Sequence, residues 1–185
     1  MSLAITPSLQ QVYAPIIAFI IAITGLPATQ VVQGIPNRVP MPKPGFITVQ
    51  ALFRSRLITN IDIWDEVDTP PVQAGIQEGV DLRVQIDCYG TTACDWANML
   101  SATLRDEYGC TQIGTLAAAQ TPPFELEPLY ADDARMIPLV AGEEQYEERW
   151  SVDAHFQVNP LTTIPQQYAD TAKVGLINVD EAYPA

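Results

Sequence analysis

The chain has 185 residues, of which 48% are hydrophobic and 17% charged, a composition typical of a globular protein rather than a disordered one. A formal net charge of −13 argues against nucleic-acid binding, because phosphate recognition depends on lysine and arginine. Three cysteines and one histidine are too few for a disulfide framework or a structural zinc site. We therefore predict one domain spanning residues 1–185, with reduced cysteines and without a cofactor or a bound metal.

The first predicted element is an N-terminal helix over about residues 7–24. Pro7 suits the first turn of a helix, Thr6 can cap its first N–H groups, and Gly25 can end it. Residues 13–28 are strongly apolar, but the run is shorter than the roughly 20 residues that cross a membrane. We therefore predict a buried helix that is covered on both faces, with a neighbouring subunit as a candidate for the second cover.

Alternating apolar residues predict the strands that follow. Residues 29–35 are expected to form a short strand, and the proline-rich stretch 36–45 an extended, rigid loop. Residues 46–65 predict two strands or one bent strand. The segment 80–88 alternates cleanly, and its inward-facing residues are expected to be Val80, Leu82, Val84, Ile86 and Cys88. The simplest arrangement pairs this segment antiparallel with the strand before it.

A second helix is predicted over residues 91–110, where apolar residues recur at three- and four-residue spacings until Gly109 ends the pattern. Its Trp96 and the Trp150 of a later strand lie on the apolar sides of their patterns, so we expect both side chains to be buried. A short last strand is expected at residues 175–180. Together these elements predict an α+β fold, with two main helices packed on an antiparallel or mixed sheet.

Residues 111–149 lack a regular periodicity. The segment is too apolar to be free in water and too rich in proline to form a central strand. We therefore predict a long irregular arm that lies partly over a neighbouring subunit or another partner. The alternative is a long loop folded over its own domain.

The sequence contains few residues in patterns typical of catalysis. The sequence has no nucleophile elbow, phosphate-binding loop, dinucleotide fingerprint or zinc-protease motif. His155 shares the polar face of its strand with Asp153, but no serine or cysteine motif accompanies them. The acidic cluster from Glu143 to Glu148 has no metal-ligand spacing, which favours a contact surface or a solvated turn. A small metal-dependent hydrolase that uses scattered acidic residues is the alternative.

Six sequence blocks, in order, resemble those of the phage neck or tail terminator family. The blocks are "QGIPNRVPMPKPGFITVQAL", "RLITNID", "VQIDCYG..A..WA", "LRDEYGC", "PLYADDARMIPLVAGEEQYEERW" and "VNPLTTIPQQYAD". They extend over about Val31 to Asp180, and the N-terminal helix matches in position and character rather than in motif. No single block is decisive, but six in the same order are strong support.

The resemblance implies a virion protein of the phage neck that is not an enzyme. Subunits of such families are small α+β domains that form a ring, commonly a hexamer, in tailed and here contractile-tailed phages. The ring would cap the tail tube, contact the tail sheath and the head-side connector, and let genomic DNA pass without sequence-specific binding. It would assemble in the host cytoplasm, without a membrane. Another head–tail adaptor of the neck is the closest alternative.

Under this interpretation the acidic cluster before Arg149 is a contact surface. We expect head-to-tail contacts through the N-terminal helix, the loop 36–45 and the arm. In the arm, Phe124, Leu129 and Tyr130 are the expected anchors, because aromatic residues and arginine often dominate interface energy. The candidate interface residues are Asn37, Arg38, Pro40, Pro42, Phe124, Leu129, Tyr130, Glu143, Glu144, Tyr146 and Arg149.

Overall fold

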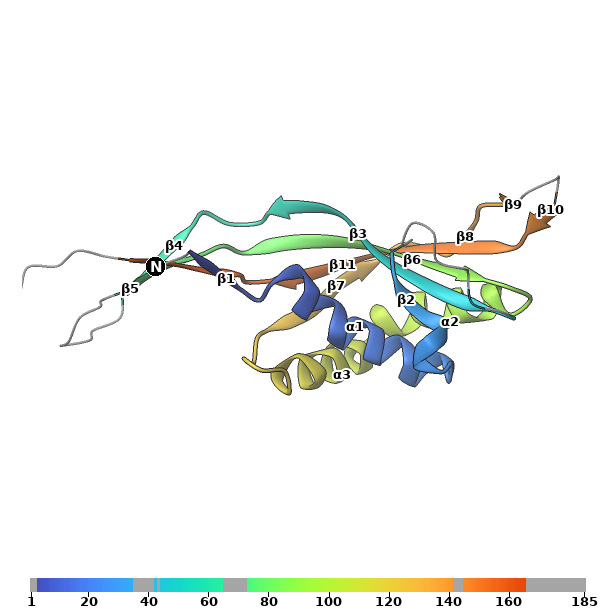
Figure 1. Cartoon of the computed structure of the whole chain (residues 1–185), viewed down its shortest axis with the longest axis horizontal. Coiled ribbons are helices and arrows are strands. Elements are labelled where there is room, and N and C mark those ends of the chain that lie inside the picture. Colours follow the sequence, from blue (N-terminus) through green and yellow to red (C-terminus); the bar gives the residue numbers. More distant parts are fainter. Residues whose placement is uncertain (1–2, 35–41, 43, 65–72, 142–144, 166–185) are drawn as a thin grey trace, which may run out of the picture.

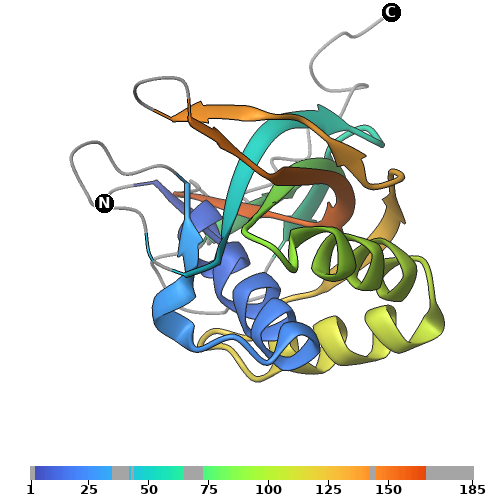
Figure 2. The same ribbon diagram turned by 90° about the vertical axis from the view of Figure 1, so that its right-hand side faces the viewer.

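The structure is a computed structural model that describes residues 3–34, 42, 44–64, 73–141 and 145–165. It confirms the predicted α+β class, with helices packed on one side of a long, twisted sheet (Figures 1 and 2). The elements are β1 (Ala4–Thr6), α1 (Leu9–Thr24), a 3-10 turn (Ala28–Gln30), β2 (Val31–Gln33), β3 (Phe46–Arg56), β4 (Ile61–Trp64), β5 (Gln73–Gln77), β6 (Val80–Tyr89), α2 (Ala93–Leu104), α3 (Glu107–Ala118), β7 (Leu126–Ala131), β8 (Arg135–Met136), β9 (Leu139–Ala141), β10 (Gln145–Glu147), β11 (Arg149–Val158) and β12 (Leu161–Pro165).

The large sheet has the strand order β2-β3-β6-β11-β7, and the short β8 also pairs with β11. Its central strand β6 runs antiparallel to both β3 and β11, so the predicted antiparallel pairing is confirmed. The alternation predicted for β6 is confirmed as well. Val80, Val84 and Ile86 are fully buried, whereas Arg83 and Gln85 on the other face are partly exposed.

A smaller sheet with the order β1-β12-β5-β4 continues the large sheet beyond the helices, at the left of Figure 1. Three strands of the large sheet are joined by short connections to strands of the smaller sheet. Strand β3 is followed by β4, β6 is preceded by β5, and β11 is followed by β12. Of the two alternatives predicted for residues 46–65, two strands rather than one bent strand are present. A register shift between Ala51 and Phe53 bends β3 shortly before the smaller sheet begins.

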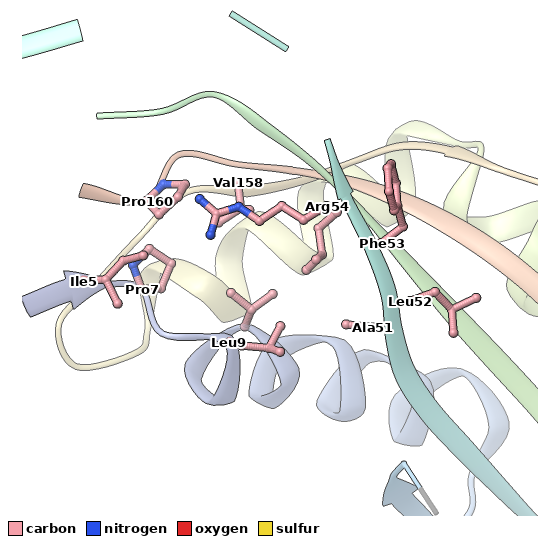
Figure 3. Close-up of a pocket in the computed structure, with 11 residues that line it drawn as sticks. Ile5, Pro7, Leu9, Ala51, Leu52, Phe53, Arg54, Val158 and Pro160 are labelled. Carbon is pink, nitrogen blue, oxygen red and sulfur yellow. The ribbon is translucent and has the colours of Figure 1, made fainter. Parts of the chain in front are cut away.

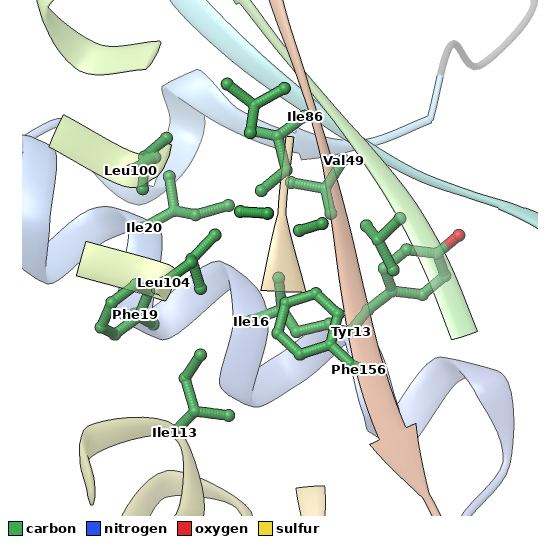
Figure 4. Packing of buried hydrophobic residues seen from close by; sticks show 14 of the residues in the cluster. Tyr13, Ile16, Phe19, Ile20, Val49, Ile86, Leu100, Leu104, Ile113 and Phe156 are labelled. Carbon is green, nitrogen blue, oxygen red and sulfur yellow. The ribbon is translucent and has the colours of Figure 1, made fainter. Parts of the chain in front are cut away.

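The core lies between α1, α2 and α3 on one side and the large sheet on the other (Figure 4). Phe19 and Ile20 of α1 meet Leu100 of α2 and Ile113 of α3, and all four are at most 1% exposed. Phe156 of β11 contributes from the sheet and is also fully buried. Helix α1 is apolar on most sides because the sheet and both other helices surround it.

The beginning of α1 differs from the prediction. Ser8, rather than Thr6, caps the helix: the Ser8 side chain accepts from the backbone N–H of Gln11, and the Gln11 side chain accepts from the backbone N–H of Ser8. This reciprocal pair is a capping box, and Thr6 instead belongs to strand β1. Gly25 ends the helix with φ of 70°, as predicted.

The single helix predicted over residues 91–110 is two helices. Helix α2 ends at Leu104, and Asp106 starts α3 by accepting a hydrogen bond from the backbone N–H of Tyr108. Gly109 lies inside α3 instead of ending a helix. An added Cβ there would lie 2.3 Å from the carbonyl oxygen of Thr103, so only glycine permits this tight turn between the helices.

The segment 111–149 is therefore more regular than predicted. It contains most of α3 and the strands β7, β8, β9 and β10, whose short lengths give too little alternation to be recognised. The last predicted strand, at residues 175–180, lies outside the described residues.

The prediction that both tryptophans are buried is wrong, because each is only partly buried. Trp96 and Trp150 are partly buried and pack against the margin of the core. The Trp150 indole N–H donates to the carboxylate of Glu148 at 2.8 Å, which keeps one edge of the ring at the surface.

Candidate functional site

The face of the large sheet opposite the helices is covered by ion pairs. Arg83 of β6 and Arg135 of β8 both donate to the same carboxylate oxygen of Asp153, and Arg149 donates to Asp87 at 2.7 Å. Strand alternation places these side chains on one face, because every second residue of β6 and β11 points away from the helices. Buried carboxylates need such partners, since an unpaired buried charge is costly.

Ion pairing on this face stabilises the charged form of Arg83. The hydrogen bond and the nearby charge of Asp153 raise the pKa of Arg83. Asp153 is only 1% exposed, yet its two arginine partners reach solvent, so the carboxylate is covered by its own counter-ions. The arrangement is a structural ion-pair network rather than an acid–base pair.

His155 is not part of a catalytic constellation. Its ring Nδ1 lies 3.0 Å from a carboxylate oxygen of Asp81 on β6, whereas Asp153, the neighbour considered from the sequence, binds the two arginines. Among the described residues, no group of three or more His, Cys, Asp or Glu side chains could hold a metal ion. Cys88 is buried, and burial, followed by the charge of Asp87, raises the pKa of its thiol to about 12.

The predicted interface residues of the arm have different surroundings. Phe124 is partly buried and packs against the core of its own subunit. Leu129 and Tyr130, on the edge strand β7, are 48% and 51% exposed. The Tyr130 ring lies between the guanidinium of Arg105, 5.7 Å from its centroid, and the ring of His155, 6.0 Å away. Leu129 and Tyr130 are thus available to a partner, whereas Phe124 supports the fold.

The other predicted interface residues fall into two groups. Arg149 pairs with Asp87 and lies over the Tyr89 ring at 5.9 Å, so its guanidinium is used within the subunit. Pro42 is partly buried, and Tyr146 lies on β10 opposite Val140. The remaining candidates lie outside the described residues: Asn37, Arg38, Pro40, Glu143 and Glu144.

An apolar groove that the sequence did not predict lies beside the N-terminus of α1 (Figure 3). It has a volume of about 270 Å³. Ile5, Pro7 and Leu9 form one wall, and residues 51–54 of β3 form the other. Leu82 and Val158 of the sheet also line it. These residues look in the sequence like ordinary strand and helix positions, so no local pattern marks the groove.

The groove belongs to a larger apolar surface on the smaller sheet and its surroundings. Among the described residues, most of the large hydrophobic side chains that are exposed lie here. We call this surface the apolar end; it consists of Leu3, Ile5, Leu9, Leu52, Phe53, Leu57, Ile58, Ile61, Ile63 and Trp64. A concentration of exposed apolar side chains of this kind is typical of a site that another molecule covers.

Comparison with known families agrees with a structural role. The model of the family described as phage neck terminator protein matches residues 10–181. The chain belongs to this family. A search of curated proteins gave no match. The phage neck terminator family is a family of structural virion proteins rather than of enzymes, so the hydrolase alternative is wrong.

The family match extends over nearly the whole neck terminator chain. It begins inside α1 and includes both the groove wall on β3 and the hairpin of β9 and β10. The resemblance seen in the sequence blocks is thereby confirmed. Among the residues that the structure describes, none of the helices combines the length and apolarity needed to span a membrane. Membership of this family implies that the protein is a structural component of the virion.

Proposed function

We propose that this neck terminator forms a ring, with six subunits, that caps the phage tail tube and joins it to the head-side connector. The tail tube protein and the connector would contact opposite faces of the ring, and the tail sheath would lie around it. The observation that supports this proposal most directly is the apolar end, a large exposed apolar surface on a protein of a structural neck family. A lone subunit leaves this surface in water, whereas an assembly covers it.

The charge of the subunit fits a ring through which DNA passes. Six subunits would have a formal charge of 6 × (−13) = −78. Five of the arginines in the described residues are neutralised by ion pairs with carboxylates of the same subunit: Arg54, Arg83, Arg105, Arg135 and Arg149. The protein therefore offers little positive surface to phosphate, and DNA can move past without being held.

The test is the length and completeness of tails made without the protein. Phages with the gene inactivated should produce tail tubes that exceed their normal length, and purified protein added during assembly should restore the length. Electron microscopy of intact particles should locate the subunit as a ring at the head-proximal end of the tube. Tubes of normal length that merely fail to join heads would indicate a head–tail adaptor instead. Tight binding of the purified ring to duplex DNA at physiological salt would contradict the acidic channel.

A further inference from the structure

One end of the subunit has a long strand edge that pairs with no other strand among the described residues. Strand β2 pairs with β3 only at Ile47–Val49, so no described strand pairs with the outer edge of β3 beyond that point. The N–H of Ala51 donates to the Tyr13 hydroxyl at 2.7 Å, which satisfies one edge position. The chain then continues into β4, which is one of the two edge strands of the smaller sheet. The free edge therefore extends along β3 and β4.

Apolar side chains lie along this same edge. Phe53 is 64% exposed and Trp64 is 61% exposed, although both belong to strands. The apolar groove lies next to Phe53, between β3 and the N-terminus of α1 (Figure 3). An exposed edge with apolar side chains favours pairing with a strand from another chain, because the backbone groups and the side chains then gain partners together.

The other end of the subunit has an unsupported hairpin. Among the described residues, β9 and β10 pair only with each other, with Val140 opposite Tyr146. They extend from the end of the molecule opposite the smaller sheet, at the right of Figure 1. A two-stranded hairpin alone is only marginally stable in water, so a third strand would stabilise it.

We propose that the apolar end binds the β9–β10 hairpin of a second copy of this chain. The hairpin would add its strands to the free edge of β4 and β3 and would cover the apolar groove. The proposal rests on the ring function proposed above and identifies the two surfaces that join neighbouring subunits. The hairpin lies within the arm 111–149, which was expected from the sequence to contact a neighbouring subunit. The surface that receives it is new, because the sequence pointed to the loop 36–45 and the N-terminal helix rather than to the apolar end.

Two observations favour a second copy as the partner. The free edge and the hairpin lie at opposite ends of one chain, so a single repeated contact joins subunits head to tail, as a ring requires. The strands are similar in length, since β4 has four residues and β9 and β10 have three each.

The experiment uses two variants, each defective in one surface. The first, Phe53→Asp with Trp64→Asp, alters the apolar end at side chains that are mostly exposed and so leaves the core intact. The second, Val140→Pro with Tyr146→Pro, removes strand N–H groups from the hairpin. Met99→Asp is the control, because Met99 is a 41% exposed hydrophobic side chain on α2, a helix that contributes to neither surface. Light scattering or mass photometry gives the oligomeric state, and circular dichroism confirms folding.

The wild-type protein and the Met99→Asp control should form the same closed oligomer. Each defective variant alone should assemble only at a protein concentration at least about tenfold higher than the wild type needs, as expected for the loss of central interface residues. An equimolar mixture of the two variants should form a dimer and nothing larger, because only one intact pair of surfaces remains.

Different failures separate the two proposals. If the wild type forms rings and the two variants do so equally well, or if their mixture gives no dimer, the assignment of these surfaces is wrong and the ring function stands. If the apolar-end variant forms normal rings but no longer binds tail tubes, the partner is the tube protein, which also overturns the inference. If the wild type remains a monomer both in solution and on purified tail tubes, the ring function itself fails.

Discussion

Replacing Asp153 by alanine tests whether the ion-pair face stabilises the subunit. The carboxylate is 1% exposed, whereas the side chains of Arg83 and Arg135 are 38% and 49% exposed. A hydrogen bond to a charged group contributes about 1.5–3 kcal/mol to stability. Because both arginines can return to water when the carboxylate is lost, we expect the cost to be close to that of one such bond, about 2–3 kcal/mol. For a chain of this size that corresponds to a melting temperature lowered by about 4–12 °C.

Urea unfolding followed by tryptophan fluorescence measures this loss, at a fixed protein concentration because assembly also stabilises the folded state. The midpoint should fall while the slope stays constant. The matched control is Asp133→Ala: this carboxylate also pairs with an arginine, Arg105, but its side chain is 94% exposed, so its removal should leave the midpoint unchanged. If Asp153→Ala and Asp133→Ala shift the midpoint equally, the desolvation of Asp153 cancels its pairing and the reasoning is refuted.

Three further predictions concern the core and its margin. Trp150→Ala should cost about 1–3 kcal/mol in urea unfolding, less than a fully buried aromatic residue, because the ring is partly exposed. Gly109→Ala should lower stability by about 1–3 kcal/mol by calorimetry, since the added methyl would meet the Thr103 carbonyl; an unchanged melting temperature would contradict the tight turn. Folding raises the pKa of Cys88 from 9.0 to about 12, so its contribution to stability is complete below pH 9 and is lost as the pH rises to 12. That alkaline loss should be smaller in Cys88→Ala, and equal losses would contradict it.

The central part of the fold could be predicted from the sequence because its strands are long and have two different faces. In β6, Val84 and Ile86 face the core while Arg83 and Gln85 face the ion pairs, so the alternation persists over the whole strand. The boundary between helices α2 and α3 was harder to predict. Apolar spacing continues from α2 into α3, and the turn at Asp106 has no proline or glycine to mark it, so the two helices look like one.

The short strands and the contact surfaces could not be predicted from local patterns. Strands β1, β5 and β12 have three to five residues, which is too few for an alternation to be distinguished from a loop. Ile61 and Ile63 alternate as core residues do, but they are exposed in the subunit. A sequence pattern does not distinguish a face that the same chain covers from a face that a partner covers. The apolar end therefore became visible only in the folded structure.

The direct passage of three strands from the large sheet into the smaller one determines how the subunit responds to mechanical load. The connections are only residues 57–60, 78–79 and 159–160, which leaves no flexible linker between the two sheets. A pull on the smaller sheet along the long axis therefore reaches β3, β6 and β11 at the same time (Figure 1). Three hydrogen-bonded strands of the large sheet therefore share the tension, which no single connection carries alone. A neck protein built in this way transmits tension directly into its most buried strands.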